Sequence, residues 1–156
     1  MRQLVVVAFA AALAVVSGLA SGAAAAEKAD VMAPVHQFMD SLNKGDTKTA
    51  LAACASPVSI IDEFPPYEWQ GATACADWAN DFAADSTKNG ITDSIVTLGK
   101  PKHVDITADR AYVVVPATYT YKQHGKKVTE SGSTLTAALQ KGSAGWRMTG
   151  WAWTKH

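Results

Sequence analysis

Residues 58–71 read VSIIDEFPPYEWQG, and the rest of the chain is organised around this stretch. It begins as a short apolar strand at residues 58–61, which ends on two carboxylates, Asp62 and Glu63. A rigid Pro-Pro loop with aromatic residues follows, and Gly71 then opens a helix. The chain before the stretch has helical patterns and the chain after it has mostly strand patterns. We therefore expect an α+β domain.

The apolar residues before this stretch recur with helical spacing. Within residues 29–42 they fall at positions i, i+4, i+7, i+8 and i+11, and the predicted buried stripe is Val31, Val35, Phe38, Met39 and Leu42. Asp46 is placed to cap a second, short helix at residues 47–55. A third helix is expected at residues 71–84, with an apolar face made of Cys75, Trp78, Ala79 and Phe82.

The chain after residue 90 predicts long strands joined by tight turns. The first covers residues 94–106, and Gly99 and Pro101 indicate a kink within it. Three more strands are expected at residues 111–122, 127–140 and 146–153. Both faces of the 111–122 strand are partly apolar, which indicates that both are covered. The helices account for one face, and a partner subunit is a way to cover the other.

The first 26 residues have the pattern of a cleaved signal peptide. Arg2 gives a basic start, an apolar run covers residues 4–19, and Ala24-Ala25-Ala26 forms a small-residue cleavage site. The apolar run has about 16 residues, fewer than the ~20 of a membrane-spanning helix, which favours cleavage over an uncleaved anchor. We expect residues 27–156 to be one exported domain, periplasmic or extracellular, without membrane attachment after cleavage.

The charge balance argues against a nucleic-acid partner. The whole chain has 14 basic and 14 acidic residues, and Arg2 is lost with the leader, so the mature chain has a net charge of about −1. Such a chain lacks the basic surface that binds a phosphate backbone. The four histidines lack metal-site spacing, and the sequence contains no phosphate-binding loop or dinucleotide motif. We expect neither a metal nor a cofactor.

The chain has two cysteines, Cys54 and Cys75, which lie on the apolar faces of the second and third expected helices. In an exported protein an even pair favours a disulfide. The alternative is two buried free thiols that pack as small hydrophobic groups. A disulfide here would be structural, because redox-active pairs are usually close in sequence, and it would link the segments that flank Asp62.

The order of these elements, together with three motifs, resembles the nuclear transport factor 2-like (NTF2-like) superfamily. The motifs are FMDSLNKGD at residues 38–46, Gly71 opening a helix beyond an acidic strand end, and GWRM at residues 145–148. The last is similar to the final strand of SnoaL-like members. The resemblance spans residues 27–156. It implies a cone in which a curved antiparallel sheet wraps around about three N-terminal helices.

The ketosteroid isomerase branch of this superfamily offers the most specific comparison for a site. By this resemblance, Asp62 lies where an aspartate shuttles a proton. The position of a catalytic tyrosine matches Phe38, which has no hydroxyl group, and that of a protonated aspartate matches Thr134. Oxyanion stabilisation usually contributes most to such catalysis. The resemblance therefore argues against the steroid-isomerase reaction.

Asp62 is the first candidate for a functional residue. A carboxylate that faces an apolar interior would have a raised pKa and act as a general base. Alternatively, it caps the Pro-Pro loop or faces water. Glu63 is expected to point the opposite way, into solvent. Five further residues are candidates for ligand contacts, with core packing as the alternative for the aromatic ones: Phe38, Trp69, Tyr119, Tyr121 and Thr134.

The last expected strand leaves one question open. Trp151 and Trp153 share one of its faces, with Met148, Gly150 and Ala152 on the other. The sequence does not decide which of these faces is concave, and the two choices imply different pockets.

Two functions fit these residues. The first is an exported cone that binds a small, largely apolar molecule, with isomerase-, cyclase- or dehydratase-type acid-base chemistry at Asp62. The second is a non-catalytic module that binds a partner or dimerises through its sheet. A hollow cone with few convergent polar groups favours the first. A filled cone with an apolar outer sheet face favours the second.

Removal of the leader has a direct test. The exported protein is expected to begin at or near Glu27 and to be recovered from the soluble extracytoplasmic fraction. Intact-mass spectrometry of the exported protein measures its first residue. A mass that retains residues 1–26, recovered from the membrane fraction, would contradict this prediction.

Overall fold

The structure is a computed structural model that describes residues 14–155, with side chains from residue 22. Residues 1–13, the first half of the expected leader, lie outside the described residues. The elements follow the order α1 (Ala14–Asn43), α2 (Thr47–Leu51), β1 (Cys54–Ile61), β2 (Glu68–Gly71), α3 (Ala74–Lys88), β3 (Ile91–Leu98), β4 (His103–Thr107), β5 (Arg110–Gln123), β6 (Lys126–Gly142) and β7 (Gly145–Thr154).

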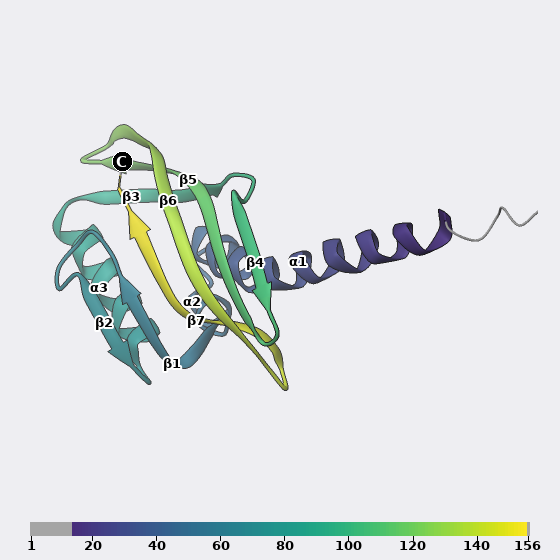
Figure 1. Cartoon of the computed structure of the whole chain (residues 1–156). Helices are drawn as coiled ribbons and strands as arrows, with labels where there is room; N and C mark the ends of the chain where they lie inside the picture. The colour runs from purple at the N-terminus through teal and green to yellow at the C-terminus, as the bar shows by residue number, and fades with distance from the viewer. Residues whose placement is uncertain (1–13, 156) are drawn as a thin grey trace, which may run out of the picture.

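The strands form one seven-stranded sheet in the order β2-β1-β7-β6-β5-β3, and β4 pairs with β5 beside β3. The long strands β5 and β6 curve over the helices (Figure 1). The expected α+β cone is therefore confirmed, with one correction. The sheet is mixed, because β1 pairs with β7 in parallel while all the other described pairs are antiparallel. Strand patterns in a sequence do not show which distant strands become neighbours.

Two extra residues shape the inner face of the sheet. Gly132, with a φ of 88°, is inserted opposite the Ala117–Thr118 step of β5. Thr149 is inserted opposite the Ala138–Leu139 step of β6. Each extra residue reverses the alternation of side chains beyond it. Met148 and Trp151 therefore both face the core, although they are three positions apart.

The predicted stripe of α1 is confirmed. Val31, Val35 and Phe38 are fully buried, Met39 is buried, and Leu42 packs against the core. Each large apolar side chain that leaves water in this way contributes about 1.5–3 kcal/mol. Residues 22–30 of the same helix are exposed, and this part of α1 projects away from the rest of the molecule (Figure 1). The domain thus begins its core at Val31.

The central stretch folds as a hairpin rather than as a strand followed by a loop. Residues Glu68–Gly71 pair with the end of β1 in antiparallel register. Tyr67 N donates to Phe64 O at 2.9 Å and Asp62 N donates to Tyr67 O at 3.1 Å, which closes the turn around the two prolines. The third helix consequently begins at Ala74, three residues later than expected.

The other element boundaries differ by a few residues. The second helix ends at Leu51 rather than at residue 55, so Cys54 opens β1 instead of lying on a helix. The kink expected near Gly99 and Pro101 is confirmed, since it separates β3 from β4.

The Cys54–Cys75 disulfide is present, and both cysteines are buried. It joins the first residue of β1 to the first turn of α3. The expected pairing is therefore confirmed, and it closes the segment that contains the hairpin.

The C-terminal end of α1 is bound to strand β3 by a side chain. Asn43 Nδ2 donates to Val96 O at 2.8 Å, and Asn43 Oδ1 accepts from Val96 N at 2.8 Å. One amide group thus satisfies both backbone groups of a strand residue, as a neighbouring strand would. This places the last turn of α1 beside β3.

Loss of the disulfide should lower the stability of the domain. The cysteines are 21 residues apart, and a bond that closes a loop of this size contributes about 3 kcal/mol in the chain-entropy model. The double variant Cys54→Ala/Cys75→Ala is expected to lower the free energy of unfolding by about this amount. Urea denaturation measures it, with the reduced wild-type protein as the control. An unchanged unfolding midpoint in both samples would show that the bond does not stabilise the fold.

Candidate functional site

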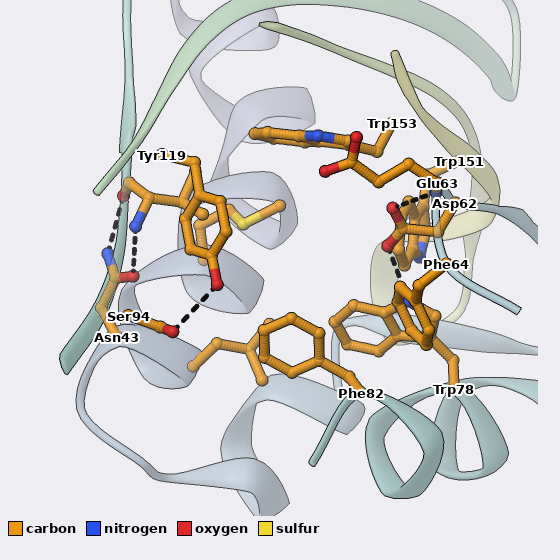
Figure 2. A pocket seen from close by; sticks show the side chains of 13 residues that line it. Asn43, Asp62, Glu63, Phe64, Trp78, Phe82, Ser94, Tyr119, Trp151 and Trp153 are labelled. Atoms are coloured by element: carbon orange, nitrogen blue, oxygen red, sulfur yellow. Dashed lines mark hydrogen bonds between the residues drawn. The ribbon is translucent and has the colours of Figure 1, made fainter. Parts of the chain in front are cut away.

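A pocket of about 100 Å³ opens among α1, the end of β1, α3, β3, β5 and β7. Figure 2 shows its side chains arranged around an open centre. Most of its wall is aromatic, from Phe64, Trp78, Phe82, Tyr119, Trp151 and Trp153. The other apolar residues are Met39, Leu42 and Val96, and the polar ones are Asn43, Asp62, Glu63 and Ser94.

Asp62 lies on the pocket wall because it continues the alternation of β1. Val58 and Ile60 face the core, and Asp62 is the next residue on that side. Its Oδ2 accepts a hydrogen bond from Trp78 Nε1 at 2.8 Å, and its Oδ1 accepts one from Glu63 N at 2.7 Å. Burial raises its pKa to about 6 against the opposing effect of these two hydrogen bonds, and the negative charge of Glu63 adds to the rise.

Glu63 turns back over the pocket instead of pointing away from it. The strand ends at Ile61, so the alternation that would direct Glu63 outward no longer applies. Lys155 Nζ lies 3.4 Å from Glu63 Oε2 and 3.3 Å from Glu130 Oε1. Lys155 therefore bridges the hairpin and β6 at the edge of the pocket. Desolvation opposes its charge, but the hydrogen bond from Lys155 to Glu130 and the charges of both glutamates raise its pKa.

A pair of hydroxyl groups lies across the pocket from Asp62 (Figure 2). Ser94 Oγ and Tyr119 Oη are 2.9 Å apart and share a hydrogen bond. Burial raises the pKa of Tyr119, so its hydroxyl keeps its proton and can act as a donor. The pair supplies the polar groups on the side of the pocket opposite the carboxyl group.

The aromatic wall is supported from behind by the ring of Phe38. Phe38 lies 5.6 Å from Trp78 and 5.7 Å from Trp151, measured between ring centroids. Trp78 and Trp151 meet edge to face at 4.9 Å. Such contacts favour fixed ring orientations. The indole nitrogen of Trp151 is buried without a hydrogen-bond partner among the described residues.

The six site residues expected from the sequence do not all lie at the pocket. Asp62 and Tyr119 line the pocket. Phe38 lies behind its wall, and Trp69 packs on Phe64 while its Nε1 donates to Asp81 Oδ2 at 2.8 Å.

Tyr121 and Thr134 also lie away from the pocket lining. The ring of Tyr121 packs against that of Tyr119 in a tilted arrangement, with the centroids 4.7 Å apart, and its hydroxyl donates to Glu130 Oε1 at 2.8 Å. Thr134 alternates with the buried Ser133 and Leu135, so its side chain points to the other face of the sheet. The structure therefore brings two of the six residues to the pocket surface and leaves the other four outside it.

The described residues lack two kinds of feature. Within residues 14–155, no group of three or more His, Cys, Asp or Glu residues is arranged to hold a metal ion. Over the same part of the chain, no helix has the length and apolar character needed to cross a membrane.

Comparison with known proteins gives similarity in structure and none in sequence. No family model matches the chain, and no curated protein matches it. An NTF2-like protein with a cystatin-like fold from Novosphingobium aromaticivorans is 14% identical, covers 92% of each chain and superposes with a TM-score of 0.70. A ketosteroid isomerase-like protein from Erwinia carotovora atroseptica is 16% identical, with 83% of this chain and 95% of the other covered and a TM-score of 0.64.

A third solved structure has the same architecture. It is a candidate dehydratase of the NTF2-like family from Streptomyces avermitilis, with 15% identity, a TM-score of 0.66, and coverage of 83% of this chain and 97% of the other. This chain has the NTF2-like fold. At these identities the likeness shows the fold alone, and the chemistry of the protein has to be inferred from its own pocket.

Several pocket residues were not singled out from the sequence. Ser94 is a half-buried residue of β3 and reaches the pocket because it faces Tyr119. A polar residue at an inward position of an otherwise alternating strand is a signal that could have identified it. Glu63 is exposed, as expected, but nothing in the local sequence indicates that its side chain turns back toward Lys155.

The raised pKa of Asp62 predicts a specific pH dependence of stability. The pKa is about 6 in the folded protein and 3.8 in the reference state. Protonated Asp62 therefore favours the fold at low pH, and this contribution is lost as pH rises through about 6. The pKa difference between the folded and the reference state corresponds to about 3 kcal/mol in the free energy of unfolding. The difference in free energy of unfolding, Asp62→Asn minus wild type, should therefore increase by about 2–3 kcal/mol when the pH is raised from 4 to 7.5.

Urea denaturation of both proteins at the two pH values measures this change. The variant also loses a hydrogen bond to Trp78 or to Glu63 N, but that loss is the same at both pH values and cancels. A difference between the proteins that does not vary with pH would mean that the carboxyl group titrates in the folded state as it does in water.

Proposed function

We propose that this protein is exported and binds a small, largely apolar molecule in the pocket, where Asp62 exchanges a proton with it. The observation that carries the proposal is an aromatic pocket with a carboxyl group of raised pKa on one side and a hydroxyl pair on the other. Pockets of this kind, mostly apolar with a few convergent polar groups, are typical ligand sites.

The polar groups have complementary roles in acid-base chemistry. A general base works best when its pKa is near the working pH, and Asp62, with a pKa of about 6, is mostly ionised at neutral pH yet still readily protonated. Ser94 and Tyr119 have two hydroxyl hydrogens between them. Their mutual hydrogen bond uses one, so the second is free for a ligand oxygen.

The reaction differs from steroid isomerisation. The residue at the tyrosine position is Phe38, fully buried behind the wall, and Thr134 points to the other face of the sheet. The volume also argues for a smaller ligand. A pocket of about 100 Å³ is well below the ~300–1,000 Å³ of sites for drug-sized molecules. The ligand is therefore a small molecule, or a small group of a larger one.

Export is supported by the leader pattern and by the disulfide. A disulfide persists mainly in oxidising compartments, and this chain has one between Cys54 and Cys75. Removal of residues 1–26 would leave the core intact, because the described side chains before Val31 are exposed. The protein is accordingly proposed to act in the periplasm or outside the cell.

The outer face of the sheet supports a second function, assembly with another copy of the chain. Tyr112 of β5 is 48% exposed on this face, and its neighbours Val114 and Pro116 are half-buried. An apolar sheet surface of this kind can pair with itself in a dimer. Such a dimer would leave the pocket on the opposite face free.

Ligand binding can be tested with a fragment set of small apolar alcohols and aromatic compounds. Fragments that bind should shift the indole NMR signals of Trp78, Trp151 and Trp153. A fragment at 100 times its dissociation constant should stabilise the fold by about 2.7 kcal/mol. Trp153→Ala removes one wall and should weaken binding, whereas the matched variant Tyr112→Ala on the outer face should not. If neither these fragments nor charged compounds of similar size shift these signals at millimolar concentration, the pocket is not a binding site.

A further inference from the structure

The charges around the pocket are unbalanced. Among the described residues, the carboxyl groups of Asp62 and Glu63 line the pocket, and Glu130 lies at its edge, where it shares the ammonium group of Lys155 with Glu63. Lys155 pairs with the two glutamates. Asp62 accepts hydrogen bonds only from the neutral groups Trp78 Nε1 and Glu63 N, and no ion pair within residues 14–155 includes it. None of the described Lys, Arg or His residues lines the pocket.

The aromatic walls add to this negative character. The face of an indole or phenyl ring carries partial negative charge and attracts cations within about 6 Å. Trp153 lies across the pocket with its ring seen edge-on in Figure 2, so one face is turned toward the open centre, and the Glu63 carboxyl group lies beside that face. Indole is the strongest of the aromatic cation acceptors, and three of the pocket residues are tryptophans.

We propose that the ligand carries a small alkylammonium group, which binds between the Asp62 carboxylate and the aromatic wall. This inference rests on the proposed function, because it assigns a chemical class to the ligand of the same pocket. The ammonium group supplies the countercharge that Asp62 lacks in the protein. Its alkyl substituents pack on the rings, so that such a ligand is still largely apolar.

A neutral ligand would have the opposite effect on Asp62. It would displace water from a carboxylate that has no charged partner, and burying an unpaired charge is strongly unfavourable. A cation replaces that water with a favourable charge interaction. Each Asp62 oxygen accepts one hydrogen bond and keeps a free lone pair that can face the ammonium group.

The size of the pocket agrees with a group of this kind. Its volume of about 100 Å³ is somewhat smaller than the ~150 Å³ of an engineered cavity that holds benzene. A trimethylammonium group is compact enough for such a space. A hydroxyl group on the same ligand could reach the Ser94–Tyr119 pair on the opposite side.

The two roles of Asp62 are compatible. A positive charge on the ligand makes protons bound near it more acidic. The ammonium group thus makes the ligand proton more acidic, and it also lowers the pKa of Asp62, which keeps the carboxylate ionised to accept that proton. The neighbouring charged or titratable groups are Glu63, Glu130, Lys155 and Tyr119, and Lys155 offsets only part of their negative charge.

Choline and its uncharged isostere 3,3-dimethylbutan-1-ol separate the effect of charge from that of shape. Isothermal titration calorimetry of the mature protein at pH 7.5 is expected to show choline binding at least about tenfold more tightly than the alcohol. Lowering the pH from 7 to 5 should weaken choline binding about tenfold, because protonation of Asp62 competes with the cation, and should not weaken binding of the alcohol.

A pair of variants tests whether the Asp62 carboxylate causes the preference for choline over the alcohol. Asp62→Asn is expected to reduce the affinity for choline to about that of the alcohol. Asp105→Asn, an exposed residue of β4 outside the pocket, serves as the matched control and should change neither affinity. If Asp62→Asn folds poorly, the pH comparison on the wild-type protein gives the same information.

The outcomes separate the two proposals. Equal binding of both compounds, or tighter binding of the alcohol, would overturn the cation inference and leave the apolar pocket as a binding site. Failure of both compounds and of the neutral fragment set would overturn the proposed function and the inference together. Tighter binding of choline that is lost at low pH and in Asp62→Asn supports both.

Discussion

The hydrogen bond from Trp78 Nε1 to Asp62 Oδ2 connects the end of β1 with α3, and the pocket depends on it. It orients the carboxyl group toward the pocket and fixes the indole that forms part of the wall. At the other end of β1, the Cys54–Cys75 disulfide makes a covalent link to the same helix. Because Cys75 and Trp78 are three residues apart, they lie on one helical face. The strand is therefore attached to α3 at both of its ends.

This double attachment explains how a charged group is kept in an aromatic wall. Burial disfavours the Asp62 carboxylate and raises its pKa, while the bonds from Trp78 and Glu63 N partly offset that cost. If the surrounding side chains could move, the Asp62 carboxylate would be exposed to water and the cost of its burial would be lost. Here Trp78 is packed between Phe38, Phe82 and Trp151, so the indole cannot turn away without breaking several ring contacts. Rigid packing of Trp78 thus preserves the raised pKa of Asp62.

Local patterns in the sequence were sufficient for most of the elements, whereas the cone was implied by the resemblance to the NTF2-like superfamily and the parallel β1–β7 pair was not foreseen. Helical spacing gave the buried face of α1, Gly99 and Pro101 marked the break between β3 and β4, and the cysteine pair gave the disulfide. The site depended on long-range register, which is not visible locally. The extra residue Thr149 lets Met148 and Trp151 face the same side, and the sequence alone could not choose between the two faces of β7.

The remaining pocket groups show the same limit. Gly132 shifts β6 so that Glu130 faces Tyr121 and Lys155. Glu63 faces the pocket because β1 ends one residue before Asp62. In β6 one inserted residue, and in β1 the position at which the strand ends, determine which side chains meet. Asp62 could be predicted from alternation along its own strand, whereas its partners depended on how other strands were aligned.

The amide of Asn43 has a consequence for how the molecule behaves among its neighbours in solution. The strand β3 lies at the border of the sheet, and unpaired backbone groups at such a border can recruit strands from other molecules. Asn43 occupies both the N–H and the C=O of Val96, in the middle of β3. A helix end thereby interrupts the row of free backbone groups along this strand. The same contact that positions α1 beside the pocket thus disfavours the addition of another strand at this edge of the sheet.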